Sequence, residues 1–314
     1  MTMRARHYGY LPPASLVVQA GLTLIELMIS LALGMLVVAA AIMLLLSSKT
    51  SFTVEDDTSR LLDAGRFAIE NISRSVRQTG YENLESEKVP IVSLATDPPN
   101  IRGVDDATLP LTSGPPPAPT TLVNHHSDIL YLQYFGAADG TVVNCAGIAV
   151  PTPLDVPGSS VYFVRQIAND EPELHCGYSD AAGNFTSTAL VSGVESFQVL
   201  YGIDTTNDGI PDRFLSATEL INLAPASAAD NWKKVVAVKV ALLMRGARTQ
   251  RADAQNETYQ LFGAPYSSTS DPGSTFSEAD PSLPATERSR TRKVFSTTIQ
   301  LRNRTAGGNM APLS

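Results

Sequence analysis

The hydrophobic pattern begins with an apolar run from Leu22 to Leu46 that contains one charged residue, Glu26. A helix rises about 1.5 Å per residue and the hydrocarbon core of a bilayer is about 30 Å thick, so about 20 apolar residues span it. The run exceeds that length and is longer than the apolar core of a secretory signal peptide. It therefore predicts a membrane-spanning helix over residues 22–46.

A helical pattern continues after the apolar run. Apolar or small residues recur at spacings of three and four, and the stripe consists of Leu61, Leu62, Gly65, Ala68, Ile69, Ile72 and Val76. Charged residues occupy the opposite side, at Asp63, Arg66, Glu70, Arg74 and Arg77. This periodicity is typical of an amphipathic helix with one buried face, and Gly80 is a suitable stop. We predict that the helix continues through residues 47–82.

Beyond residue 83 the pattern changes to that of strands. Five β-prone segments cover residues 129–135, 161–164, 194–204, 232–246 and 293–304. In the last three the alternate positions are mostly apolar, namely Phe197, Val199 and Tyr201, then Val236, Val238, Val240, Leu242 and Met244, then Phe295, Thr297, Ile299 and Leu301. One apolar face per strand predicts an antiparallel sheet packed against another element.

The amphipathic helix supplies the matching apolar face for this sheet. Pro- and Ser-rich stretches at residues 85–126 and 246–290 predict long surface loops, and the second has no apolar pattern beyond Tyr259 to Phe262. The expected fold class is therefore α+β: a long N-terminal helix packed on an antiparallel β-sheet, with residues 83–314 forming a β-rich globular domain with long loops.

Charge indicates how the chain is oriented. Arg4 and Arg6 precede the apolar run and a group of acidic residues, 55–57, follows it closely. The positive-inside rule then puts the N-terminus in the cytoplasm and the globular domain in the periplasm. The 314-residue chain has a net charge of −8, which argues against a nucleic-acid-binding surface.

The chain has two cysteines, Cys145 and Cys176. In an oxidising compartment such a pair predicts a disulfide, here closing a loop of about 30 residues. The alternative is a metal site, because His175 adjoins Cys176, and His125 and His126 lie upstream. No zinc-type ligand spacing supports that alternative.

An acidic loop, DTTNDGIPD, occupies residues 204–212 between two predicted strands. Oxygen-bearing groups alternate along it as in calcium loops, at Asp204, Thr206, Asp208, the Ile210 carbonyl and Asp212. A plain hairpin turn is an equal alternative, because Asn-Asp-Gly sequences favour such turns. Calcium is the one cofactor suggested, and none is required. The nucleophile-elbow, phosphate-loop, zinc-protease and dinucleotide motifs are lacking, so we do not expect an enzyme.

The string Gly21-Leu22-Thr23-Leu24-Ile25-Glu26 resembles the class III signal of type IV pilins and pseudopilins. The resemblance implies a leader peptide over residues 1–21, cleavage by a prepilin peptidase between Gly21 and Leu22, and N-methylation of Leu22. It also implies that Glu26 pairs with the terminal amine of a neighbouring subunit in the filament. The chain departs from the family pattern in having Leu22 rather than Phe after the cut, and in the distance of Arg4 and Arg6 from Gly21.

Four further strings resemble PilW-type minor pilins and occur in that family's order: GRFAIENISRSVRQTGY, VSGVESFQVLYGIDTTNDGIPDRF, NWKKVVAVKVALLMR and RKVFSTTIQLRNR. This resemblance implies a low-abundance subunit of the type IV pilus that primes assembly and remains near the tip. Its implied partners are other minor pilins, the major pilin, a tip adhesin, the prepilin peptidase and the inner-membrane assembly platform. The subunit would reside in the inner membrane before assembly and in the pilus at the cell surface afterwards.

Two alternatives use the same N-terminal pattern. One is a minor pseudopilin of a type II secretion system, which carries the same kind of signal. The other is an uncleaved single-pass protein with a periplasmic binding domain. The mature N-terminus separates them, because an uncleaved anchor begins at Met1 and a processed pilin at Leu22.

Overall fold

The computed structural model describes residues 21–82, 98–110, 117–120, 126–150, 157–166, 170–180, 183–249, 256–266, 271–280, 283 and 285–303. The predicted leader up to residue 20 lies outside these residues, as do Arg4, Arg6 and His125. The chain divides into two compact units, Met1–Thr53 and Val54–Ser314.

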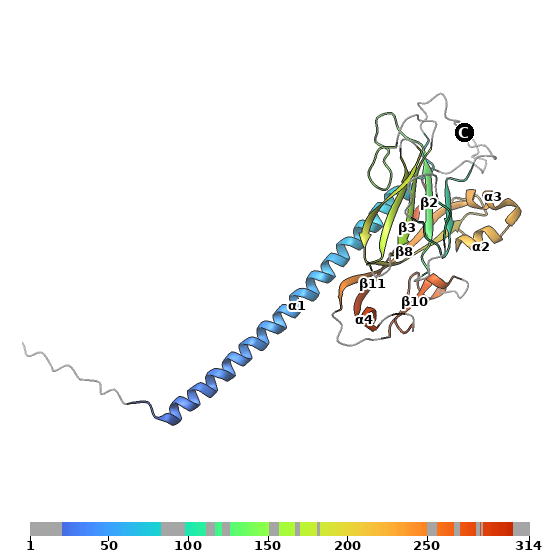
Figure 1. Cartoon of the computed structure of the whole chain (residues 1–314). Coiled ribbons are helices and arrows are strands. Elements are labelled where there is room, and N and C mark those ends of the chain that lie inside the picture. The colour runs from blue at the N-terminus through green and yellow to red at the C-terminus, as the bar shows by residue number, and fades with distance from the viewer. Residues whose placement is uncertain are drawn as a thin grey trace, which may run out of the picture. The chain divides into compact units, whose positions relative to one another are not determined.

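Helix α1 runs from Leu24 to Gln78 (Figure 1) and covers both the predicted apolar span and its amphipathic continuation. Its apolar part is long and hydrophobic enough to cross a membrane, and the side chains of that part are exposed. The helix ends four residues before the predicted limit of 82. Gly80 has a φ of 72°, a left-handed conformation that glycine adopts at little cost, so it is the stop that the sequence predicted.

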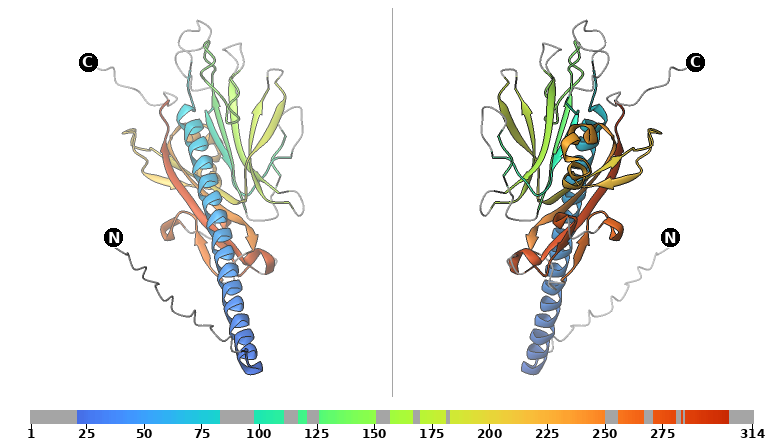
Figure 2. Two further views of the ribbon diagram at one scale, coloured as in Figure 1. Left: turned by 90° about the vertical axis from the view of Figure 1, so that its left-hand side faces the viewer. Right: turned by 90° about the vertical axis from the view of Figure 1, so that its right-hand side faces the viewer.

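The second unit contains two main sheets (Figure 2). Every described strand pairing is antiparallel. The first sheet has the order β1-β2-β3-β4-β5, from Ile101–Val104, Ile129–Tyr134, Gly158–Arg165, Glu173–Ser179 and Phe185–Ser192. The second has the order β11-β8-β6-β7, from Arg290–Gln300, Val235–Thr249, Val194–Ile203 and Arg213–Leu215. The α+β class is confirmed, but the single predicted sheet is in fact two.

Short elements complete the described part of this unit. A small sheet pairs β9, Thr258–Gln260, with β10, Thr275–Ser277. The helices are α2, Ala217–Asn222, α3, Ala228–Lys233, and α4, Ala285–Arg288. Three 3-10 turns are η1, Pro225–Ser227, η2, Ala264–Tyr266, and η3, Pro272–Ser274.

One continuous core joins the C-terminal part of α1 to both main sheets. Leu61, Ala68, Ile72 and Val76 of α1 are buried in the same apolar cluster as Leu130 and Tyr162 of the first sheet and Phe197 and Val240 of the second. At Gly65 a Cβ atom would lie 2.4 Å from the Phe295 ring, so this glycine allows β11 to approach the helix closely. The predicted buried stripe is thus confirmed, although Leu62 and Ile69 are only half-buried at its edge.

The second sheet is covered on both faces, which corrects the expectation of one apolar face. Ala241 and Leu243 of β8 point away from the main core and pack with Leu261, Phe276 and Leu283. Those three residues belong to the stretch 246–290, which the sequence predicted to be a surface loop. The few apolar residues of this stretch are spaced too irregularly to show a period in the sequence. They nevertheless suffice to cover Ala241 and Leu243 on the outer face of β8.

Candidate functional site

The predicted assembly residues lie at the start of α1. Thr23 precedes the first helical turn, and its Oγ1 accepts a hydrogen bond from the Glu26 backbone N–H at 3.3 Å. The Glu26 carboxylate in turn accepts from the Thr23 N–H at 3.1 Å and from the Thr23 hydroxyl at 3.0 Å. This reciprocal pair is a capping box, which satisfies N–H groups that the first turn leaves without partners. Thr23 therefore fixes where the Glu26 carboxylate lies, a role that the sequence reasoning missed.

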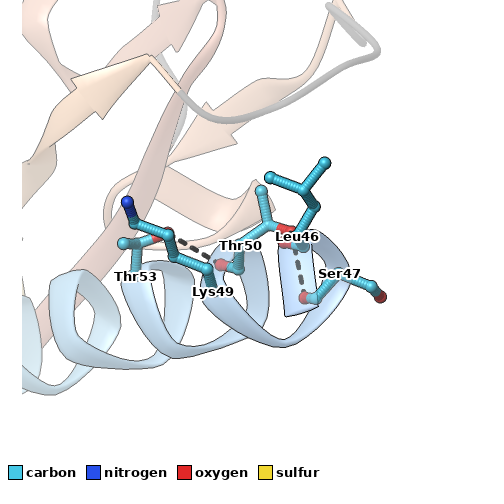
Figure 3. Close-up of a pocket in the computed structure, with 5 residues that line it drawn as sticks. All are labelled: Leu46, Ser47, Lys49, Thr50 and Thr53. Atoms are coloured by element: carbon cyan, nitrogen blue, oxygen red, sulfur yellow. Dashed lines mark hydrogen bonds between the residues drawn. The ribbon is translucent and has the colours of Figure 1, made fainter. Parts of the chain in front are cut away.

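The rest of the apolar part of α1 carries few polar groups, and these bond within the helix. Ser30 donates to the Glu26 carbonyl at 2.7 Å, and Thr50 donates to the Leu46 carbonyl at 2.7 Å. An open depression beside the helix is lined by Leu46, Ser47, Lys49, Thr50 and Thr53 (Figure 3). Because the hydroxyls of Thr50 and Thr53 are bonded to helix carbonyls, this depression presents little for a ligand to bind.

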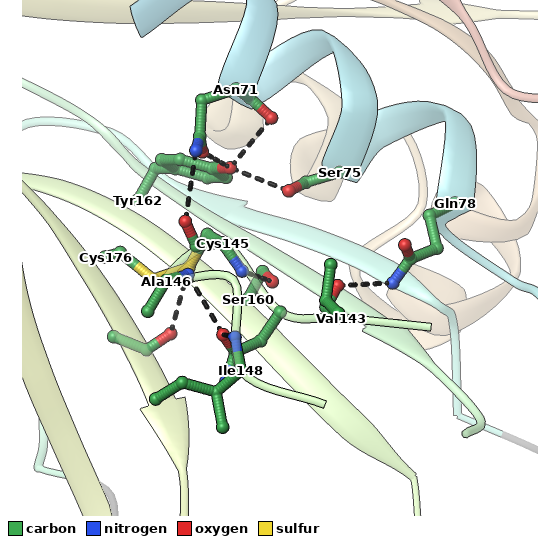
Figure 4. The surroundings of a disulfide bond; sticks show 12 residues. Asn71, Ser75, Gln78, Val143, Cys145, Ala146, Ile148, Ser160, Tyr162 and Cys176 are labelled. Carbon is green, nitrogen blue, oxygen red and sulfur yellow. Dashed lines mark hydrogen bonds between the residues drawn. A yellow bond between two sulfur atoms is a disulfide. The ribbon is translucent and has the colours of Figure 1, made fainter. Parts of the chain in front are cut away.

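The predicted disulfide is present and joins Cys145 to Cys176 of β4, 31 residues apart in sequence (Figure 4). The segment that leads into Cys145 is also hydrogen-bonded to α1. Asn71 donates to the Cys145 carbonyl at 3.1 Å, and Gln78 donates to the Val143 carbonyl at 2.9 Å. The segment at Val143 and Cys145 is thus held covalently to the first sheet and by hydrogen bonds to the helix.

A buried polar cluster explains why α1 carries Asn71 and Ser75 on its buried side. The Tyr162 hydroxyl of β3 donates to Asn71 Oδ1 at 2.6 Å and lies 2.7 Å from Ser75 Oγ. A buried phenol without a partner is costly, and these two side chains remove that cost. The helical periodicity alone could not show that Asn71 and Ser75 are buried, because both are polar residues in a pattern that predicts burial from apolar ones.

The metal alternative for the cysteines is overturned by the disulfide, because both sulfur atoms are used in it. His175 is buried beside Cys176; its Nε2 lies 3.4 Å from Glu173, and its ring stacks on Phe163. Burial lowers the pKa of His175 and outweighs the opposing effect of Glu173. Over the described residues no group of three or more His, Cys, Asp or Glu side chains is placed to hold a metal ion.

In the acidic loop each predicted carboxylate accepts hydrogen bonds from the loop itself. Asp204, almost fully buried, accepts from the N–H groups of Thr206, Asn207 and Gly209 at 3.1, 2.6 and 2.6 Å. Asp208 accepts from the Ile210 N–H at 2.8 Å, and Asp212 accepts from the Thr205 N–H at 2.7 Å. Asn207 and Gly209 both have positive φ, at 62° and 86°. The arrangement is that of a side-chain-stabilised turn.

Calcium binding at this loop stays a prediction. The hydrogen bonds within the loop favour the plain turn over a calcium site. We expect full-length protein to melt at the same temperature in calcium and in chelator, because the carboxylates are directed at backbone N–H groups. A calcium-dependent rise in melting temperature that Asp208→Ala removes would show that the loop rearranges around an ion. Thr206 and the Ile210 carbonyl would then be the remaining ligands to test.

The same loop should respond to acid. Burial raises the pKa of Asp204, but the N–H donors, led by Gly209 and Asn207, outweigh burial and leave the pKa below its ordinary value. A carboxyl group with a lowered pKa stabilises the fold at neutral pH and loses that contribution as pH falls below about 4. Asp204→Asn, measured by thermal unfolding against pH, should be less stable than wild type at neutral pH and should converge on it in acid.

An ionic network that the sequence reasoning missed lies where β6, β8 and β11 meet. The Arg292 guanidinium binds both carboxylate oxygens of Glu195, at 2.6 and 2.9 Å, and Glu278 at 3.2 Å. All three side chains are fully buried. Arg245 extends the network to Glu171 at 2.9 Å and to Glu287. No local signal marks these residues, because the partners are separated by up to about a third of the chain.

Comparison with known proteins finds two family models that match parts of the chain. Residues 161–303 match the model of type IV pilus-assembly protein W, and residues 18–42 match the prokaryotic N-terminal methylation motif. Among solved structures, a type IV-like pilin from Thermus thermophilus is similar at 16% identity and a TM-score of 0.39, covering 78% of this chain and 97% of that one. A search of curated proteins finds no match. The methylation motif on its apolar helix and the PilW region in its β-rich unit together support a type IV pilin of the PilW type.

Proposed function

We propose that this protein is a minor pilin that helps to initiate type IV pilus assembly and stays near the pilus tip. Pilin-family proteins are structural subunits, and the PilW match favours a pilus over a type II secretion system. The proposed partners are other minor pilins, the major pilin and a tip adhesin. Before assembly the apolar part of α1 would anchor the subunit in the inner membrane, with its β-rich unit in the periplasm.

The observation that carries the proposal is the placement of Glu26 within the methylation motif. Glu26 is the one charged residue in the part of α1 from residue 24 to residue 46, and the side chains of this part are exposed. In a low dielectric an unpaired carboxylate is destabilising, whereas one paired with an ammonium group is tolerated and fixes the register of the partners. Cleavage after Gly21 would create such an ammonium group at Leu22, and Glu26 of one subunit would pair with the amine of its neighbour.

Two Glu26 variants separate the charge from the helix cap. Glu26→Gln keeps an oxygen that can accept from Thr23 but removes the charge, whereas Glu26→Ala removes both. We expect both variants to be inserted and processed normally yet to co-purify poorly with other pilins, because breaking a buried ion pair costs about 3–5 kcal/mol. The measurements are the mature N-terminal sequence and the number of pili on cells.

Controls distinguish assembly from processing. Ser30→Ala, one turn further along the helix, should assemble as wild type. Gly21→Leu should remain uncleaved because the peptidase must approach this backbone closely. Normal piliation by Glu26→Gln would exclude charge pairing, and a wild-type protein that retains Met1 would favour the uncleaved anchor instead.

A further inference from the structure

The first sheet ends at β5 in an edge that differs from the other edges of the two main sheets. β1 packs beside α2 and α3, β7 has three residues, and β11 carries Arg290, Arg292 and Lys293. Short, covered or charged edge strands are the usual protection against pairing with another chain. β5 is eight residues long, and its sequence, FTSTALVS, contains no charged residue and no proline.

The outer edge of β5 is uncovered as well as uncharged. Within the described part of the chain, β5 pairs with β4 alone, and none of its residues forms a hydrogen bond to another element. Thr188 and Ala189 are exposed in the middle of the strand, with Ser187 and Leu190 half-buried on either side of them. A row of backbone N–H and C=O groups is therefore open to a partner.

The hairpin between β4 and β5 determines which backbone groups face outwards. At its turn the Asp180 N–H donates to the Asn184 carbonyl at 2.8 Å, so these two residues form a hydrogen-bonded pair. Bonded and non-bonded pairs alternate along an antiparallel ladder. Counted from this turn through the register of β4 with β5, the β5 residues in non-bonded pairs are Phe185, Ser187 and Ala189. Their N–H and C=O groups therefore point away from β4, and a bulge ends the regular edge after Ala189.

The side chains on the two sides of this edge differ in what an added strand would contact. Thr188 lies opposite Cys176, which belongs to the main core, so Thr188 also points to the core side, whereas Ser187 points to the other. On the core side Tyr178 and Leu190 pack against the core but are only half-buried. A strand with apolar side chains on this side would remove more of both residues from water, which is favourable.

We propose that the outer edge of β5, over residues 185–189, is a docking site for an extended, uncharged segment of a partner protein, which adds to the first sheet as a further strand. A row of alternating donors and acceptors is satisfied along its length by another extended backbone. Partner residues directly opposite Phe185, Ser187 and Ala189 exchange both hydrogen bonds with them and point to the same side of the sheet. The partner residues between these point to the core side, where an unpaired charge would be costly. The inference concerns the β-rich unit and does not depend on Glu26.

A capped peptide of about seven alternating threonine and valine residues is the probe, because it is uncharged and long enough to span residues 185–189. Its binding to full-length protein in mild detergent is measured by fluorescence anisotropy. We expect the valines to face the core side, so that the threonine N–H groups face β5. N-methylation of the threonines should then weaken binding at least about tenfold, because several backbone hydrogen bonds are lost together, whereas N-methylation of the valines should change it by less than about twofold.

Two variants locate the peptide at β5. Ser187→Pro removes one outward N–H but no bond to β4, as proline is tolerated on an edge strand whose nitrogen faces solvent, so it should weaken binding and keep the melting temperature. Ser187→Ala should bind as wild type.

No binding by the unmethylated peptide, equal binding by the two methylated peptides, or wild-type binding by Ser187→Pro would each overturn the proposal. So would a dimer in detergent that Ser187→Pro converts to a monomer, because a second copy would then occupy the edge. If Ser187→Pro does not fold, the two methylated peptides still decide on the wild-type protein.

Discussion

Replacing Arg292 with Met is expected to lower the free energy of unfolding by about 3–5 kcal/mol. The substitution keeps most of the side-chain volume but removes the guanidinium that binds both buried carboxylates, Glu195 and Glu278. Arg245, whose Nη1 lies 3.6 Å from Glu195, remains as a longer contact to one of them. Both glutamates are fully buried, so water cannot screen the charge that remains. Breaking one side of a buried ion pair is far more destabilising than removing the whole pair.

Matched variants isolate the uncompensated charge as the cause. The triple variant Arg292→Met, Glu195→Gln and Glu278→Gln removes all three charges and should recover a large part of the lost stability. Arg60→Met removes an arginine that pairs with Asp56 on the helix surface with a 78% exposed side chain, and should change stability by less than about 1 kcal/mol.

Trp232 is the single tryptophan and is buried in edge contact with Tyr201, so its fluorescence reports unfolding of this unit. Urea unfolding of full-length protein in mild detergent gives the free energies. A loss below about 1 kcal/mol for Arg292→Met would mean that water reaches the network or that the glutamates are not buried in solution.

Removing the disulfide is expected to have the second large effect. A closed loop of 31 residues restricts the unfolded chain, and its loss costs roughly 3–4 kcal/mol in the chain-entropy model. We expect the double variant Cys145→Ser and Cys176→Ser to unfold at lower urea by the same Trp232 signal. The native fold should survive at low temperature, because Asn71 and Gln78 still hold the segment at Val143 and residue 145 to α1.

Reductant provides the internal control. It should destabilise wild type to the level of the double variant and leave the double variant unchanged. Adding Asn71→Leu to the double variant should destabilise it further, because the Cys145 carbonyl and the Tyr162 hydroxyl both lose a partner. Mass spectrometry of unreduced wild type that finds two free thiols would contradict the pairing.

The sequence by itself determined the features that are encoded locally. The apolar run, Glu26 and the preceding Gly21-Leu22 are contiguous, so the signal and the helix can be read without knowing the fold. Gly80 ends α1 because its conformation suits only glycine at that point. With two cysteines in the chain, a disulfide could only join Cys145 to Cys176, and the structure decided for it against a metal site. Strand β8 was predictable because its alternate positions are continuously apolar.

The tertiary structure alone decided the features that depend on which strands become neighbours. Asn71 and Ser75 interrupt a periodic stripe in the sequence, yet they are buried because Tyr162 from β3 brings a hydroxyl to them. Period-two patterning reports that a strand has a buried face but not which sheet it joins, so one sheet was expected where two occur. The Arg292 network combines residues from distant segments, because burial of a charge is stabilised only by partners that the complete topology supplies.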